Sequence, residues 1–128
     1  MVQNILLIED EAALQKTIGE VLQKEGYNML SAMDGEEGIK IAREKKPDLI
    51  LLDLILPKKD GFGVLSSLKS NSETKSIPII VLTNLGEMEN IDRAVELGAT
   101  TYLVKSDYSL KEIVEKIKTA LSSAAPGA

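Results

Sequence analysis

The stretch LILLDLILP, residues 49–57, places one acidic residue, Asp53, inside a run of aliphatic residues. Four aliphatic residues in succession are typical of a central strand in a parallel sheet, because helices cover such a strand on both faces. Pro57 and the pair Asp60–Gly61 indicate a turn, so we expect Asp53 where this strand ends. A charged side chain avoids a buried position unless it is paired or binds a metal ion. Taken alone, however, Asp53 could simply cap a nearby backbone group.

The composition of the chain excludes several kinds of active site. Its 128 residues are 44% hydrophobic and 27% charged, which is typical of one globular domain. The sequence has no cysteine and no histidine. Disulfides, thiolate chemistry, Ser-His-Asp catalysis and ordinary zinc sites are therefore excluded. The net charge of −5 argues against direct nucleic acid binding by this chain.

The start of the chain carries no targeting signal. Residues 1–4 contain no basic residue, and the apolar run that follows is interrupted by three acidic residues at positions 9–11. No apolar run approaches the length of about 20 residues that a membrane span needs. We therefore expect a cytoplasmic protein without a membrane partner.

Short aliphatic runs alternate with helical patterns along the whole chain. Capping boxes at Asp34 with Glu37 and at Ser109 with Glu112 predict two of the helix starts. Five such alternations predict an α/β fold, a doubly wound parallel sheet of five strands with five helices. We expect the domain to span residues 1–121, with residues 122–128 as a flexible tail or the start of a linker. The predicted strands are residues 5–8, 27–32, 49–52, 77–82 and 101–104.

Polar residues follow four of these five strands. Glu9 and Asp10 follow the first strand, Asp53 the third, Thr83 the fourth and Lys105 the fifth. The carboxyl ends of parallel strands meet at one edge of the sheet, where the functional crevice of such folds lies. Chance would place one or two polar residues there, but the full set indicates a site.

The chemistry of this set favours a magnesium ion and a phosphoryl group. Two like charges about 4 Å apart repel by about 4 kcal/mol at an effective dielectric constant near 20. Three carboxylates therefore call for a cation, and oxygen ligands without His or Cys favour Mg²⁺. A lysine and a threonine hydroxyl suit phosphoryl oxygens, and a carboxylate can serve as the nucleophile.

The chain resembles the receiver domains of two-component response regulators, including the single-domain chemotaxis type, over residues 3–121. The resemblance implies the flavodoxin-like strand order 2-1-3-4-5. Its signature is dispersed along the chain and consists of Glu9–Asp10, Asp53 with Pro57 and Asp60–Gly61, Thr83, Tyr102 and Lys105.

The resemblance implies a role for each residue of the acidic group. Asp53 would accept a phosphoryl group from a phosphohistidine of a sensor histidine kinase or a phosphotransfer protein. Asp10, Asp53 and the backbone carbonyl of Ile55 would hold Mg²⁺. Glu9 would help directly or through a water molecule.

The same resemblance implies roles for the remaining residues. Lys105 would pair with the phosphoryl oxygens, and Thr83 would reach toward them after phosphorylation. Tyr102 would report the change on the face formed by the fourth helix, fifth strand and fifth helix, although an ordinary half-buried tyrosine explains it equally well. We expect a slow autodephosphorylation and a monomer that dimerises, if at all, when phosphorylated. The downstream target or output domain is not identified by the sequence.

Three positions depart from the common pattern of the family. Glu9 stands where aspartate is common, and Asn84 follows Thr83 where a smaller residue is frequent. Ser106 stands where proline is usual, and a cis peptide bond before serine would cost roughly 3 kcal/mol.

Other classes of protein fit the sequence less well. A haloacid-dehalogenase-like phosphatase needs a second aspartate at the position of Ile55, and an EF-hand needs oxygen ligands at Ile55 and Pro57. In a flavodoxin-like nucleotide site, the acidic residues 9–11 would repel phosphate. The remaining alternative is a phosphorylation-independent docking module of the receiver type. Such modules usually lack part of the acidic, threonine and lysine set, which is complete here.

Overall fold

A computed structural model of the chain describes residues 2–123, and it contains five strands and five α-helices in strict alternation. Loops of different lengths connect them, and a 3-10 helix, Lys105–Asp107, follows the last strand. The strands are β1 (Asn4–Ile8), β2 (Asn28–Ala32), β3 (Leu49–Leu52), β4 (Ile79–Thr83) and β5 (Thr101–Val104); the helices are α1 (Ala12–Lys24), α2 (Gly35–Lys45), α3 (Gly61–Ser70), α4 (Met88–Glu96) and α5 (Leu110–Ser123).

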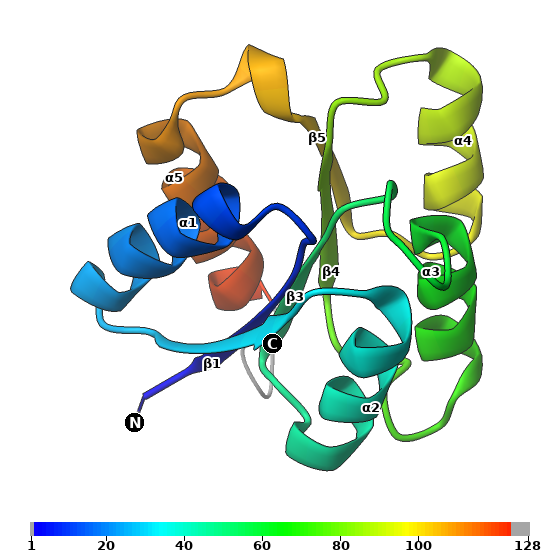
Figure 1. Ribbon diagram of the computed structural model, residues 1–128, viewed down its shortest axis with the longest axis horizontal. Coiled ribbons are helices and arrows are strands. Elements are labelled where there is room, and N and C mark those ends of the chain that lie inside the picture. The colour runs from blue at the N-terminus through cyan, green and yellow to red at the C-terminus, as the bar shows by residue number, and fades with distance from the viewer. Residues whose placement is uncertain (1, 124–128) are drawn as a thin grey trace.

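The five strands form one parallel sheet in the order β2-β1-β3-β4-β5. Helices α1 and α5 cover one face of this sheet, and α2, α3 and α4 cover the other (Figure 1). The predicted fold class and strand order are thereby confirmed. The register pairs Ile8 with Leu52 and Leu52 with Val81, so the carboxyl ends of β1, β3 and β4 lie at the same edge.

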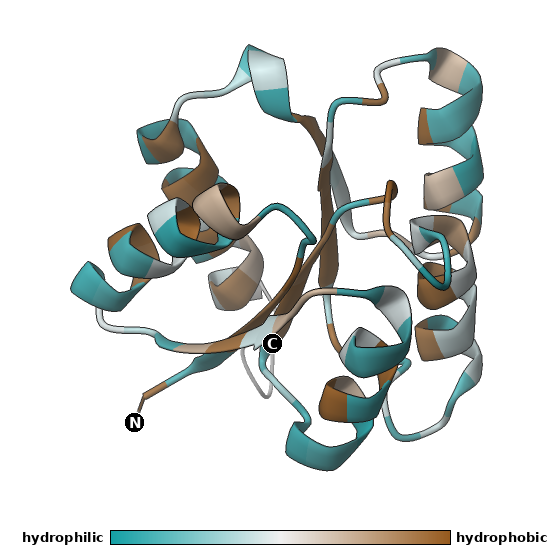
Figure 2. Cartoon of the chain, in the orientation of Figure 1, coloured by the Kyte–Doolittle hydropathy of each residue, from teal (hydrophilic) through white to brown (hydrophobic). Residues whose placement is uncertain are grey.

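The alternation of side chains along the strands divides the core in two. Leu49 and Leu51 of β3 pack with α1 and α5, whereas Ile50 and Leu52 pack with the helices of the opposite face. All four side chains are fully buried, and each such burial is worth about 1.5–3 kcal/mol. Figure 2 shows the hydrophobic strands enclosed by helices whose outer faces are hydrophilic. A continuous aliphatic run is therefore what this central strand requires.

Both predicted capping boxes are present. The Asp34 carboxylate accepts a hydrogen bond from the Glu37 amide at 2.8 Å, and the Glu37 carboxylate accepts one from the Met33 amide at 3.0 Å. Ser109 and Glu112 make the equivalent pair of bonds at the start of α5. These bonds satisfy amide groups that a helix start leaves without partners.

The sequence left open whether the bond between Lys105 and Ser106 is cis. Peptide bonds are trans throughout the described residues, so this bond is trans. Helix α5 continues through Ser123, so residues 122 and 123 of the predicted tail are helical, and residues 124–128 lie outside the described part of the chain. Among residues 2–123, no helix has the length and apolar character needed to cross a bilayer.

Candidate functional site

Three carboxylates from two neighbouring strands meet at the predicted edge of the sheet. Glu9 and Asp10 follow β1, and Asp53 follows β3, which pairs directly with β1. One carboxylate oxygen of each residue lies within 4.8 Å of the others. Glu9 and Asp53 are buried and Asp10 is exposed. This oxygen-only cluster is compatible with a divalent cation.

Lys105 supplies the positive charge of this cluster. Its ammonium nitrogen lies 2.6 Å from a Glu9 oxygen and 2.9 Å from Asp53 Oδ2. Burial lowers the pKa of Lys105, but the hydrogen bonds and the attraction of the two carboxylates outweigh it, so the pKa is raised above its ordinary value of 10.5. The site therefore favours the charged form of this lysine.

Glu9 is held less favourably than Lys105. Burial raises the pKa of its carboxyl group and the Asp53 charge adds to this effect, although the bonds from Lys105 and from the Glu11 amide oppose it. The ammonium group of Lys105 also bonds to Asp53, and it does not compensate for the burial of Glu9. The charged form of Glu9 is thus disfavoured in a site that favours the charged form of its partner.

Both carboxylate oxygens of Asp53 have a hydrogen-bond donor. The Ile55 amide donates to Oδ1 at 3.1 Å, and Lys105 donates to Oδ2. The Asp53 amide donates to the Ile8 carbonyl at 3.1 Å, which extends the pairing of β1 and β3 by one residue. The residue is therefore fixed in backbone and side chain at the end of the central strand. The Ile55 side chain itself is 57% exposed beside it.

Thr83 and Tyr102 converge on the loop after β4. The Thr83 hydroxyl is buried and accepts a hydrogen bond from the Leu85 amide at 3.5 Å. The Tyr102 hydroxyl donates to the Leu85 carbonyl. Burial raises the pKa of Tyr102, and the negative charge of Asp53 contributes. In the described residues, no hydrogen bond joins Thr83 to Asp53 or Lys105.

A model of the response regulator receiver domain matches residues 5–118. The chain belongs to this family. Receivers are phosphorylation-dependent switches, so the function predicted from the sequence, a phosphoacceptor receiver of a two-component system, is confirmed at this level.

Relatives of this receiver are transcriptional regulators. The probable transcriptional regulator ycf27 of Porphyridium aerugineum is 40% identical over 119 residues, which are 93% of this chain and 48% of that protein. The phosphate regulon regulatory protein PhoB of Escherichia coli K12 is 38% identical over 126 residues, 98% of this chain and 55% of that protein. The receiver thus spans about half the length of the curated relatives it matches.

Solved receiver structures have the same fold. A receiver domain protein from Methanospirillum hungatei superposes with a TM-score of 0.90 at 25% identity, with 97% of each chain covered. The Mn²⁺-bound form of the response regulator Rcp1 superposes with a TM-score of 0.77 at 32% identity, with 98% of this chain and 96% of that chain covered.

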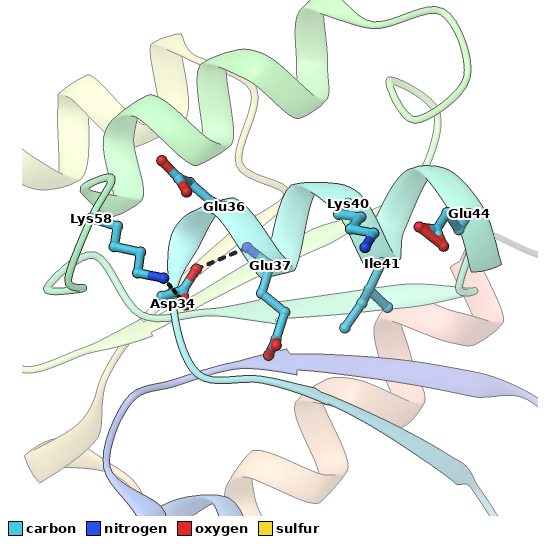
Figure 3. Close-up of a pocket in the computed structure, with 7 residues that line it drawn as sticks. All are labelled: Asp34, Glu36, Glu37, Lys40, Ile41, Glu44 and Lys58. Carbon is cyan, nitrogen blue, oxygen red and sulfur yellow. Dashed lines mark hydrogen bonds and ion pairs between the residues drawn. The ribbon is translucent and has the colours of Figure 1, made fainter.

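A separate hollow of about 450 Å³ on the receiver contains none of the predicted site residues. It lies along α2 (Figure 3). At its edge, the Lys58 ammonium group pairs with the Asp34 carboxylate at 3.6 Å, and the same carboxylate accepts a hydrogen bond from the Glu37 amide. Four acidic residues, two basic residues and one aliphatic residue line this hollow. Its lining residues are Asp34, Glu36, Glu37, Lys40, Ile41, Glu44 and Lys58.

Two contacts at the site were not predicted from the sequence. The side chain of Gln15 donates to the Glu9 carbonyl at 3.0 Å. Gly61 lies so close to the Asp53 carbonyl that an added Cβ would be 2.5 Å from its oxygen. The Asp60–Gly61 pair indicated a turn, but nothing in its spacing indicates this close approach. A glutamine one turn into a helix gives no indication in the sequence that its side chain contacts a site.

Proposed function

We propose that this receiver accepts a phosphoryl group on Asp53 from a phosphohistidine of a sensor histidine kinase or phosphotransfer protein. The observation that carries the proposal is the environment of Asp53. Its carboxylate is buried at the end of the central strand, both of its oxygens are held by donors, and Glu9 and Asp10 lie beside it. A carboxylate held in this way is a preorganised nucleophile for phosphoryl transfer.

The oxygen ligands fit a Mg²⁺ ion. Glu9, Asp10 and Asp53 would hold it through their carboxylates, together with the backbone carbonyl of Ile55. When bound, the ion supplies positive charge to the phosphoryl oxygens and relieves the repulsion among the carboxylates. The Mn²⁺ ion in the Rcp1 structure, a relative at 32% identity, supports a divalent ion in this receiver too.

Asp53, Lys105 and Thr83 would take part in the phosphoryl transfer itself. A carboxylate oxygen of Asp53 forms the new bond to phosphorus, the bond from phosphorus to the imidazole nitrogen breaks, and its electron pair stays on the imidazole. Lys105 already contacts Asp53 Oδ2 at 2.9 Å, so it is placed to pair with the oxygens of the attached phosphoryl group. The buried Thr83 hydroxyl is the second donor for these oxygens.

The Asp53→Asn variant tests the acceptor. With acetyl phosphate and Mg²⁺, we expect the wild type to gain one phosphoryl group by intact-mass analysis and the variant to gain none, because an amide is not a nucleophile for phosphorus. Asp92→Asn, an exposed change on α4, is the matched control and should react like the wild type. Equal labelling of Asp53→Asn would contradict the assignment. An unlabelled wild type that still binds a partner would favour the docking module.

The output of this receiver is proposed from its relatives. These are transcriptional regulators about twice as long as the chain, so a target or output domain would read the phosphorylated state. We propose that the α4–β5–α5 face transmits it, through the loop contacted by Thr83 and Tyr102. The resting chain would be a monomer, with dimerisation confined to the phosphorylated form.

The lifetime of the phosphorylated state should depend on two apolar side chains. Hydrolysis needs an aligned water molecule, and Ile55 and Leu85, two residues after Asp53 and Thr83, offer it no hydrogen bond. We expect Ile55→Asn and Leu85→Glu to raise the rate of dephosphorylation by about tenfold, the worth of one well-placed hydrogen bond. The bonds that Leu85 makes to Thr83 and Tyr102 use its backbone, so the substitution leaves them in place.

The control for this prediction is Ile55→Leu, which keeps an apolar side chain and should keep the wild-type rate. The measurement is the decay of the phosphorylated fraction after the donor is removed. Asn84 can also orient a water molecule, so Asn84→Ala belongs in the same series. If both polar substitutions leave the decay unchanged or slow it, water exclusion by Ile55 and Leu85 is wrong.

A further inference from the structure

The side chain of Gln15 joins three backbone segments beside the acidic cluster. It projects from the first turns of α1, and its amide nitrogen lies 2.9 Å from the Ala32 carbonyl and 3.0 Å from the carbonyls of Leu7 and Glu9. A carboxamide nitrogen carries two hydrogens, so at least one of them is shared between two acceptors. One side chain therefore ties α1 to the ends of both β1 and β2.

These bonds lie where the regular pairing of β1 and β2 stops. The last pair in their register is Ile8 with Ala32, and the Glu9 amide still donates to the Ala32 carbonyl at 3.0 Å. Beyond this point the chain leaves the sheet and enters the acidic loop. Gln15 provides a donor to the Glu9 carbonyl at the point where the sheet no longer does.

The orientation of the Gln15 amide is fixed by its surroundings. With its nitrogen and oxygen exchanged, a carbonyl oxygen would face three other carbonyl oxygens. The nitrogen therefore faces the carbonyls of Leu7, Glu9 and Ala32, and it is the group of this side chain that reaches the two strand ends.

The acidic loop needs such a tether because it is repelled by its neighbour. When ionised, Glu9 and Asp10 bring two negative charges within 4.8 Å of Asp53, and Lys105 is the cation that opposes them in this cluster. Each like pair at about 4 Å is unfavourable by about 4 kcal/mol at an effective dielectric constant of 20. The repulsion pushes the loop away from β3, and a hydrogen bond to the Glu9 carbonyl resists that movement.

We propose that Gln15 is a positioning residue that fixes the backbone at Glu9, and thereby holds the carboxylates of Glu9 and Asp10 in place to receive the cation. This inference rests on the proposed function of the site, because it assigns Gln15 to the same metal ligands. Gln15 touches neither the phosphoryl group nor the cation in this scheme. It acts through the backbone that carries their ligands.

The test compares three substitutions at one position. Gln15→Met keeps the length of the side chain and removes the hydrogen-bond donor. Gln15→Glu replaces the donor with a carboxylate, whose oxygens would point toward the three carbonyl oxygens. Gln15→Lys keeps a hydrogen-bond donor. Gln23→Met is the matched control, because Gln23 lies on the same helix with an exposed side chain. Calorimetric titration of the metal-free proteins with MgCl₂ measures affinity, after circular dichroism has shown that each variant is folded.

We expect Gln15→Met and Gln15→Glu to weaken Mg²⁺ binding by about tenfold or more, the usual effect of removing support behind a metal ligand. Gln15→Lys and Gln23→Met should stay within about twofold of the wild type. The rate of phosphorylation by acetyl phosphate at saturating Mg²⁺ should change much less than the half-saturating Mg²⁺ concentration, because Asp53 itself is untouched. A merely structural role for Gln15 would not separate these two quantities.

A second measurement does not depend on the metal. Amide hydrogen exchange at Glu9 and Glu11 in the metal-free protein should be faster in Gln15→Met than in the wild type and Gln15→Lys. If Mg²⁺ affinity in Gln15→Met stays within twofold of a wild type that binds Mg²⁺, the positioning role is overturned. If the wild type binds no Mg²⁺, the proposed metal site is wrong. If, in addition, hydrogen exchange at Glu9 and Glu11 is the same in Gln15→Met as in the wild type, the proposed tether is wrong as well.

Discussion

The Gly61→Ala variant of this receiver should lose about 3 kcal/mol of folding free energy or more, the upper range for forcing an atom into a packed site. Gly61 opens α3, and its amide donates to the Leu54 carbonyl at 2.9 Å. An added Cβ would overlap the Leu54 Cα atom and lie 2.5 Å from the Asp53 carbonyl oxygen. Both neighbours are backbone atoms of the strand end, so no side-chain rotation relieves the overlap. We expect phosphorylation of Asp53 to fall together with stability.

The control for this variant is Gly19→Ala, which should have the opposite sign. Gly19 lies inside α1, and an added Cβ there meets no atom within 4 Å. Alanine in a helix interior is favoured over glycine by about 0.5–1 kcal/mol. Urea denaturation of the two variants beside the wild type measures both effects. A Gly61→Ala protein within 0.5 kcal/mol of the wild type would show that α3 can withdraw from the strand end at little cost.

The central strand and the polar strand ends were predictable because topology alone determines them. A strand buried on both faces must be apolar at every position, and LILL at residues 49–52 meets that requirement. Parallel strands all end at one edge, so Glu9, Asp53 and Lys105 had to follow their strands at the same edge of the sheet. The capping boxes were predictable for a similar reason, since their bonds are local.

Contacts that depend on distances between elements were not predictable. The sequence predicted Lys105 at the same sheet edge as the carboxylates. Its hydrogen bonds to Glu9 and Asp53, however, depend on how far the lysine side chain extends across that edge. The approach of Gly61 to the strand end depends on how α3 packs. On α4, Met88 and Val95 have the spacing of a buried face, yet they are 68% and 56% exposed, and Ala94 is the buried residue of that helix. The spacing of these residues is typical of a helix but does not locate its buried face.

The Lys105→Met variant should reveal the charge balance of the site most directly. Its side chain is 17% exposed, and it bonds to Glu9 and Asp53, whose side chains are 3% and 8% exposed. Removal of one partner from a buried ion pair costs about 3–5 kcal/mol, because the other partner stays buried without compensation. We expect a loss near the lower figure at pH 7 without metal. Methionine keeps most of the volume of the side chain, so the loss reports charge rather than packing.

The expected pH dependence of this loss follows from Glu9. Without Lys105, burial and the Asp53 charge raise the pKa of Glu9 unopposed by the lysine, further above its ordinary value of 4.5. A carboxyl group with a raised pKa in the folded state binds a proton more readily there than in the unfolded chain. The difference in stability between variant and wild type should therefore shrink as the pH is lowered toward 4.5, and it should be largest above the raised pKa.

Added Mg²⁺ should replace part of the lost positive charge. At 100 times its dissociation constant it stabilises a folded protein by about 2.7 kcal/mol, so the melting temperature of Lys105→Met should rise clearly with Mg²⁺. The control is Lys118→Met. Lys118 pairs with Glu25 at the same 2.6 Å distance, but with side chains 46% and 36% exposed, and such surface pairs contribute little to stability. If Lys105→Met is as stable as Lys118→Met and its melting temperature ignores both Mg²⁺ and pH, then Lys105 does not balance the buried carboxylates. Lys105 bonds to two buried carboxylates and Lys118 to one exposed carboxylate, so a larger loss at Lys105 is the result expected when its removal leaves two buried carboxylates without compensation.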